Sequence, residues 1–94
     1  IADLADAYAT PLAMHNLSSP LGTIASAHVA ASISNFLTLE IHSFEVPVWH
    51  DLVNESVLSN GNIVVPERPG LGVTLDLDTV SENLLDGETM FEEV

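Results

Sequence analysis

The chain has 94 residues, 47% of them hydrophobic, and a formal net charge of -13, because 14 acidic residues stand against a single basic one, Arg68. This hydrophobic content excludes an intrinsically disordered chain. The shortage of Lys and Arg argues against a nucleic-acid-binding protein or one held on anionic lipid, since both need positive charge to meet phosphate. With no cysteine, the chain has no disulfides and no thiolate chemistry.

Residues 7–39 carry no formal charge, which raises the question of a membrane span. Prolines and polar residues, among them Pro11, His15 and Pro20, interrupt this stretch, so no run of about 18 apolar residues exists. The start shows no basic segment followed by an apolar core, and no signal peptide is expected. We therefore expect a soluble, cytoplasmic protein with no membrane partner, whose first half is buried and whose second half is solvated.

Apolar residues from Ile1 to Tyr8 recur at helical spacing, and no capping residue precedes them. This pattern predicts a helix that belongs to a longer sequence, and Pro11 ends it. Residues 11–14 form a short apolar run of strand length. The polar residues and turn formers of 15–22 then predict a loop.

Small residues dominate 23–33, which predicts a helix able to lie close against a sheet. Residues 34–35 break this helix, and 36–41 form an apolar strand with a charged end. Strand, helix and strand with short links make the βαβ unit of a parallel sheet, so the sequence predicts an α/β fold. His15 and Glu40 follow the apolar parts of the two strands, at the carboxyl ends where parallel sheets build their sites.

The pattern changes after the second strand. Residues 46–53 predict a loop with one short helix. Asn60 and Gly61 lie between two apolar runs and predict a hairpin, because both residues tolerate a positive φ. An acidic helix is expected over 78–85, and the acids of 86–94 predict a frayed tail.

Three segments resemble one enzyme family: His15 to Thr23 (HNLSSPLGT), Asn35 to Glu40 (NFLTLE) and Val65 to Val73 (VPERPGLGV). Together with Ala27-His28 on the small-residue helix, they resemble the last part of the mandelate racemase branch of the enolase superfamily. Within that branch the chain is most similar to the acid-sugar dehydratases. The resemblance runs from about Ile1 to Val80 and covers only the final part of a family member.

The resemblance implies the C-terminal part of a modified TIM barrel. Residues 1–55 would be the end of the β/α barrel, 56–85 a hairpin segment that returns to a capping domain, and 86–94 a flexible acidic tail. It also implies Mg²⁺ as the cofactor, a small-molecule sugar acid as the substrate and a homo-oligomer for the intact protein. The metal ligands are expected upstream of this chain.

The same resemblance assigns roles to individual residues. His15 would be the base that removes the proton beside the substrate carboxylate, oriented by an Asp on a preceding strand that this chain lacks. Glu40 would hydrogen-bond to that carboxylate, a role that needs a shielded, protonated carboxyl group. Asn16, Ser18 and Ser19 are candidates for contacts with substrate hydroxyls, although loop polarity explains them equally well.

The intact enzyme would convert an aldonate to a 2-keto-3-deoxy acid, and the 94-residue chain alone is expected to be inactive. Two alternatives stay open. One is a racemase, epimerase or cycloisomerase of the same superfamily, and the other is a non-enzymatic acidic interaction module. The acidic composition fits a surface adapted to concentrated salt.

Three further residues have structural interpretations. His28 lies in the middle of the predicted helix and is expected to pack or bond within the barrel shell. Trp49 is expected to anchor the short helix. His42 and His50, with the acids near them, do not match the ligand spacing of an established zinc site.

Overall fold

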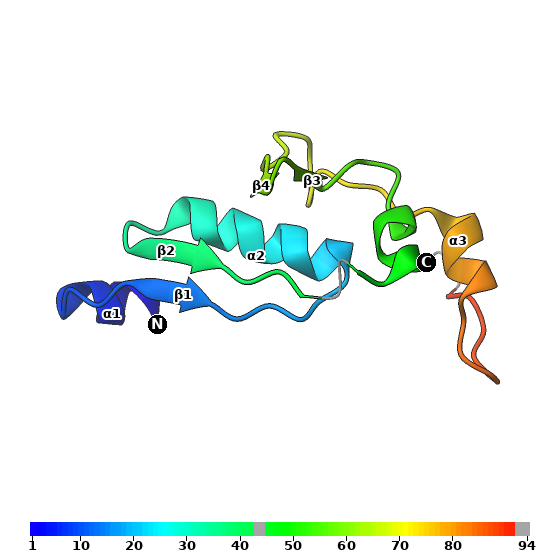
Figure 1. The fold of residues 1–94 in the computed structure, drawn as a ribbon, viewed down its shortest axis with the longest axis horizontal. Helices are drawn as coiled ribbons and strands as arrows, with labels where there is room; N and C mark the ends of the chain where they lie inside the picture. The colour runs from blue at the N-terminus through cyan, green and yellow to red at the C-terminus, as the bar shows by residue number, and fades with distance from the viewer. Residues whose placement is uncertain (43–44, 92–94) are drawn as a thin grey trace.

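The computed structural model describes residues 1–42 and 45–91, so residues 92–94 of the predicted acidic tail lie outside the described part. Figure 1 shows the elements in chain order. They are α1 (Ala2–Ala7), β1 (Leu12–Met14), α2 (Pro20–Ser32), β2 (Phe36–Leu39), the 3-10 helix η1 (Pro47–Leu52), β3 (Leu58–Ser59), β4 (Asn62–Ile63) and α3 (Leu77–Glu82).

The βαβ unit predicted from the sequence is present. Strands β1 and β2 pair in parallel, with Leu12 opposite Phe36 and Met14 opposite Leu39, and α2 makes the crossover between them. One further hydrogen bond, from Glu40 N to Met14 O at 2.9 Å, continues the pairing beyond β2. The α/β fold is therefore confirmed, and the ends of both strands are held side by side.

Helix α2 begins at Pro20, so the prediction of a start at residue 23 was wrong. Proline is favoured at the first helical position because its fixed φ suits a helix and its missing N–H would have had no partner there. A hydrogen bond from Thr23 N to Ser19 O at 2.9 Å closes the first turn. The polar loop is thus shortened to residues 15–19.

The first turn of α2 lies unusually close to this loop. A Cβ added at Gly22 would stand 2.4 Å from Ser18 Cβ and 2.8 Å from Ser18 Oγ, distances that real side chains do not tolerate. Glycine at position 22 therefore lets the helix approach the segment that follows β1. The fold requires a residue without a side chain at this point.

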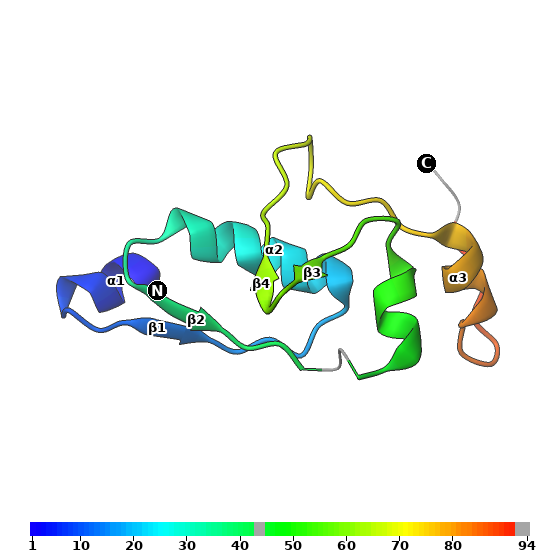
Figure 2. The ribbon, with the colours of Figure 1, turned by 45° about the horizontal axis from the view of Figure 1, so that its top comes forward.

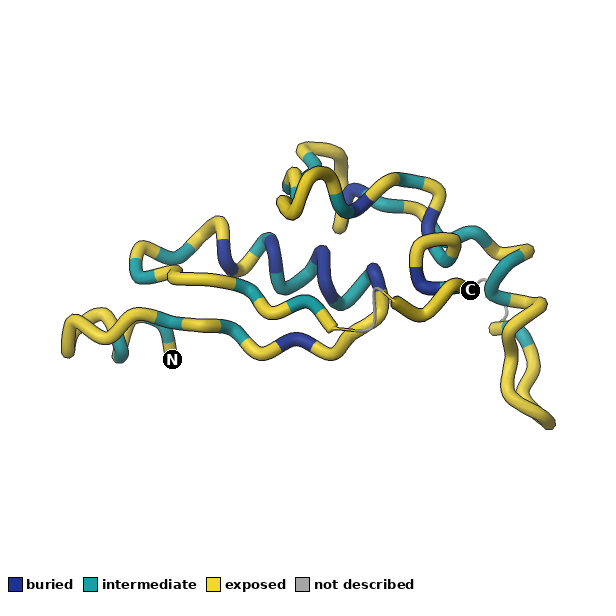
Figure 3. The backbone as a smooth tube through the Cα atoms, in the orientation of Figure 1, coloured by how far each residue is buried: buried dark blue, intermediate teal, exposed yellow. Residues whose placement is uncertain are grey.

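The main buried cluster lies between the start of α2, η1 and the segment after it (Figure 3). Ile24 is 1% exposed and packs with Trp49, Val53 and Val57, all buried. Partly buried side chains complete this cluster: Leu21, Leu58, Ile63, Val73 and Leu75. The expectation that Trp49 anchors the short helix is confirmed by its burial. Ala27 and Ala30, also buried, line the side of α2 that faces β2.

The prediction of a buried first half was wrong for the described residues. Helix α1 has no buried residue, and Leu4, Tyr8 and Leu37 are all exposed. The accessible surface is 6815 Å², against about 5,200 Å² for a compact monomer of this mass. The elements of this chain therefore leave much of the apolar surface of α1, β1 and β2 uncovered.

The radius of gyration is 15.4 Å, against about 13 Å for a compact chain of about 100 residues. Figure 1 shows the reason, since α1 and α3 lie at opposite ends of an elongated molecule. Among the described residues, no helix combines the length and the apolar character needed to cross a membrane.

The predicted hairpin is also present. Asn60 and Gly61 have φ angles of 50° and 74°, and Leu58 pairs with Ile63 in antiparallel fashion. Figures 1 and 2 show β3 and β4 beside α2, and residues of α2, β2 and β4 line one pocket. The acidic helix is shorter than expected, because α3 ends at Glu82. The return of this segment to a capping domain stays a prediction.

Two polar links fasten the segment after the hairpin. Arg68, the only Lys or Arg of the sequence, binds Glu55 at 2.8 Å through its Nη2, which also donates to Gly72 O at 2.7 Å. His28 Nε2 donates to Leu71 O at 3.1 Å, so this histidine bonds to the loop after the hairpin, and its place in a barrel shell stays a prediction. The loop that carries Arg68 and Leu71 is thereby tied both to α2 and to the segment that follows η1.

The link between Arg68 and Glu55 depends on pH through the carboxyl group of Glu55. The backbone N–H of Thr74, which donates to Glu55 Oε2 at 2.7 Å, lowers the pKa of Glu55 below its ordinary value of 4.5, and Arg68 adds to the effect. A carboxyl group with a lowered pKa stabilises the fold above its unfolded-state pKa. This stabilisation disappears as the pH falls through the lower pKa of the folded state.

We expect acidification from about pH 6 to about pH 3 to lower the thermal midpoint of the protein less in Glu55→Gln than in the wild type, because the variant has no carboxylate to protonate. Scanning calorimetry across this range measures the difference. Glu88→Gln is the control, since it removes the same charge at a residue outside the helices and strands. Equal pH dependence of wild type and Glu55→Gln would contradict the assignment.

Gly22→Ala is expected to lower the thermal midpoint. Alanine is normally preferred over glycine inside a helix by about 1 kcal/mol. Here the added methyl group meets Ser18, and overpacking of this kind costs about 1–3 kcal/mol. In a Ser18→Gly background the same change should be neutral or stabilising, because the atoms that clash are absent. The same loss in both backgrounds would show that Ser18 is not the obstacle.

Candidate active site

The two principal site residues predicted from the sequence meet in the structure. His15 follows β1 and Glu40 follows β2, so the parallel pairing brings them to the same edge of the sheet. His15 Nδ1 lies 2.5 Å from Glu40 Oε2. Their side chains are 73% and 45% exposed, which leaves both open to a ligand. The shielding expected for a protonated Glu40 is not supplied by the described residues.

This arrangement is suited to proton transfer. A histidine whose Nδ1 is held by a carboxylate has a fixed ring orientation and tautomer, and its Nε2 is then the nitrogen that can accept a proton. Glu40 contacts the ring nitrogen for which the resemblance implies an aspartate of a preceding strand, whereas the partner expected for Glu40 was the substrate carboxylate. The pair therefore combines a base with a group that sets the direction in which the base acts.

Asn16 lies next to the pair but faces inward. It is only 3% exposed, and both ends of its amide are engaged within the chain. Its Oδ1 accepts from Ser18 N at 3.3 Å, and its Nδ2 donates to Thr23 Oγ1 at 2.9 Å. Its backbone N–H donates to Glu40 Oε2 at 3.4 Å. Unlike Asn16, the other two predicted substrate contacts, Ser18 and Ser19, are exposed on the same loop.

Sequence reasoning missed two residues that hold this loop. Thr23 is completely buried and receives the hydrogen bond from Asn16, while Trp49 Nε1 donates to Ser18 O at 3.0 Å. A threonine in the first turn of a small-residue helix carries no pattern that distinguishes it. The contact of Trp49 joins residues 31 positions apart, and no local signal indicates it.

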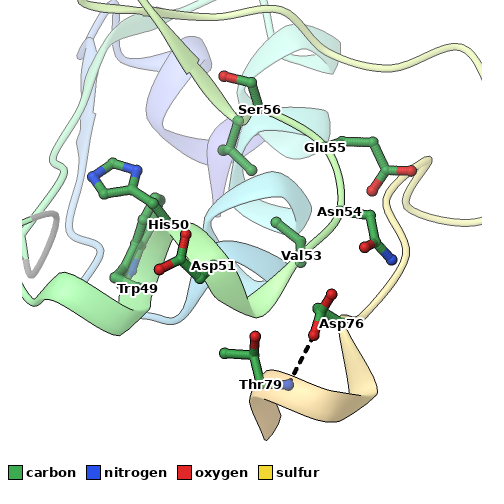
Figure 4. Close-up of a pocket in the computed structure, with 10 residues that line it drawn as sticks. Trp49, His50, Asp51, Val53, Asn54, Glu55, Ser56, Asp76 and Thr79 are labelled. Carbon is green, nitrogen blue, oxygen red and sulfur yellow. Dashed lines mark hydrogen bonds between the residues drawn. The ribbon is translucent and has the colours of Figure 1, made fainter.

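A cavity of about 520 Å³ lies away from His15 and Glu40, between η1 and α3 (Figure 4). Its lining includes the carboxylates of Asp51, Glu55 and Asp76. Asp76 caps α3 by accepting from Thr79 N at 2.8 Å, and this N–H lowers the pKa of the Asp76 carboxyl group. Since Glu55 and Asp76 both hold the fold together, we assign no chemistry to this cavity.

The resemblance implies Mg²⁺, so the described residues should be compared with the ligand set that a metal ion needs. Within residues 1–42 and 45–91, no three side chains of His, Cys, Asp or Glu lie close enough together to hold a metal ion. His15 and Glu40 form a pair without a third ligand. The described residues therefore do not form a magnesium site of their own.

Comparison with known proteins gives relatives along almost the whole chain. This chain is 57% identical over 94 residues to a D-xylonate dehydratase of Haloferax volcanii, and the match covers 99% of this chain and 23% of that protein. It is 28% identical over 92 residues to a D-gluconate/D-galactonate dehydratase of Picrophilus torridus, covering 97% of this chain and 24% of the relative. The chain thus spans about a quarter of the length of these curated relatives.

A solved structure agrees with this relationship. The crystal structure of a mandelate racemase/muconate lactonizing enzyme-like protein from Rubrobacter xylanophilus superposes with a TM-score of 0.90 at 43% identity. The match covers 98% of this chain and 24% of that protein. The family model described as Enolase C-terminal domain-like matches residues 1–79, which include both strands and the His15–Glu40 pair, and the chain belongs to this family.

Proposed function

We propose that the chain is the C-terminal portion of a sugar-acid dehydratase, a hydro-lyase that converts an aldonate to a 2-keto-3-deoxy acid. The observation that carries the proposal is the contact between His15 Nδ1 and Glu40 Oε2 at the carboxyl ends of two parallel strands. The dehydratase names of two relatives support the choice of reaction.

In the proposed reaction, His15 takes the proton from C2 of the aldonate through Nε2. The electron pair of the broken C–H bond moves toward the carboxylate and forms an enediolate. A further acid, supplied by the full-length protein outside this chain, donates a proton to the hydroxyl group on C3. As the C3–O bond breaks, water leaves, the electron pair of the enediolate forms the C2–C3 double bond, and the resulting enol tautomerises to a ketone at C2. Glu40, which contacts His15 Nδ1, would hydrogen-bond to the substrate carboxylate, and the aspartate expected to orient His15 would come from outside this chain.

The full-length protein is expected to need more than this chain supplies. Mg²⁺ is the proposed cofactor, with its ligands outside the chain, because the described residues offer no set of three ligands. We further propose that the full-length protein is a cytoplasmic homo-oligomer with no nucleic-acid or membrane partner. Sedimentation of the purified full-length protein measures the oligomeric state.

The activity is tested on the full-length protein that contains this chain, supplied with Mg²⁺ and with D-xylonate, D-gluconate or D-galactonate. We expect a 2-keto-3-deoxy acid as the product. His15→Asn and Glu40→Gln should each lower kcat by about 10²–10⁴-fold, the range for loss of general acid–base catalysis. His28→Asn is the matched control, because this histidine bonds to Leu71 O away from the site.

Three results would contradict the proposal. An epimerised aldonate without loss of water would identify a racemase or epimerase, and a cyclised product would identify a cycloisomerase. Absence of any aldonate chemistry would favour the acidic interaction module. The 94-residue chain alone is expected to be inactive, and any Mg²⁺-dependent turnover by it would contradict that expectation.

Salt dependence is a further expectation of the proposal. Arg68 is the only Lys or Arg to set against 14 acidic residues, so self-repulsion opposes folding at low ionic strength. At about 1 M salt the screening length falls to about 3 Å, which removes most of this repulsion. We expect the thermal midpoint of the full-length protein to rise between dilute and molar KCl, and a constant or falling midpoint would oppose salt adaptation.

A further inference from the structure

Asn16 and Thr23 form a buried polar pair immediately behind the candidate active site. Asn16 is 3% exposed and Thr23 is fully buried, and 2.9 Å separates Asn16 Nδ2 from Thr23 Oγ1. Buried polar groups that lack a partner are costly, so this bond fixes the orientation of the Asn16 side chain. With this burial the pair contributes almost no surface to a ligand.

The side-chain amide of Asn16 holds the loop at Ser18, and the backbone N–H of Asn16 contacts Glu40. Its Oδ1 accepts from Ser18 N, and the backbone N–H of Asn16 donates to Glu40 Oε2, the same oxygen that contacts His15. Two further contacts act on Ser18: Trp49 Nε1 donates to its carbonyl oxygen, and Gly22 lets the helix approach its side chain. His15 itself is bonded to Asn16 through the chain.

From these contacts we infer that Asn16, held by Thr23, is a positioning residue that fixes His15 and Glu40 for proton abstraction, and that it does not bind the sugar acid. The catalytic part of this inference rests on the proposed function. Positioning matters for the rate because a shift of about 1 Å at a reacting group can lower the rate by about 10²-fold. The exposed His15 and Glu40 side chains have few other contacts to fix them.

Thr23 offers a test that leaves the ligand-facing surface unchanged, because its side chain is fully buried. Thr23→Val keeps the shape and removes the acceptor of the Asn16 bond, whereas Thr23→Ser keeps a hydroxyl group. The control is Ile24→Val, which loosens the adjacent core without altering a polar contact. All variants are made in the full-length protein.

The first measurement is hydrogen exchange, which needs no enzymatic activity. Thr23→Val should make backbone amides of residues 16–19 exchange about tenfold faster, since local opening becomes easier. Thr23→Ser and Ile24→Val should retain the exchange rates of the wild type in this segment. Unchanged exchange in Thr23→Val would overturn the inference, because Thr23 would then not hold the loop.

The second measurement is steady-state turnover of the aldonate. Thr23→Val should lower kcat by about 10- to 100-fold while KM changes by less than about threefold, and Thr23→Ser should restore kcat. Equal kcat values in Thr23→Val and Ile24→Val would overturn the catalytic part of the inference. A wild-type protein without aldonate turnover would instead refute the proposed function, and the exchange data would still decide whether the pair holds the loop.

The opposing hypothesis, that Asn16 contacts a substrate hydroxyl, predicts a different pattern. Asn16→Ala would then raise KM for the sugar acid, and Thr23→Val would leave kcat unchanged. That combination of results would overturn the inference and restore the assignment made from the sequence. A fall in kcat for both Asn16→Ala and Thr23→Val, with rescue by Thr23→Ser, supports the positioning role.

Discussion

The packing of helix α2 on two sides is the constraint on which the structure depends. One side presents Ala27 and Ala30 toward β2, and such small side chains let a helix lie close to a sheet. Another side presents Ile24 to Trp49 and Val53. Leu21 and Ile24 of α2 pack in the cluster with the C-terminal segment, and His28 bonds to Leu71 O, so α2 joins the βαβ unit to that segment.

The same helix couples this core to the candidate site. Thr23 and Ile24 are adjacent in the first turns of α2, yet one side chain bonds to Asn16 and the other packs against Trp49. Trp49 completes the connection by donating to Ser18 O. A change in the core can therefore move the loop that carries His15. A control for any site variant must separate an effect through the Thr23–Asn16 bond from an effect through the packing of Ile24 on Trp49.

The sequence was informative where local physics decides the outcome. Pro11 and the apolar spacing predicted β1, and the turn residues Asn60 and Gly61 predicted the hairpin, because each depends on neighbouring residues only. The meeting of His15 with Glu40 followed from the parallel βαβ rule. Burial of Asn16 was missed because it depends on how the loop packs against α2. The start of α2 at residue 20 was missed although Pro20 is itself a local signal for a first helical position.

The charge of the chain has two opposing effects that salt changes together. Screening weakens the attraction between Arg68 and Glu55, which helps to fasten the loop after the hairpin to the segment that follows η1. It also weakens the mutual repulsion of the remaining acids, for which the sequence offers no second Lys or Arg. With one Arg against 14 acidic residues, the repulsions outweigh the attraction, so concentrated salt should favour folding overall. The Thr74 N–H and the His28–Leu71 bond then retain the attachment that the ion pair loses.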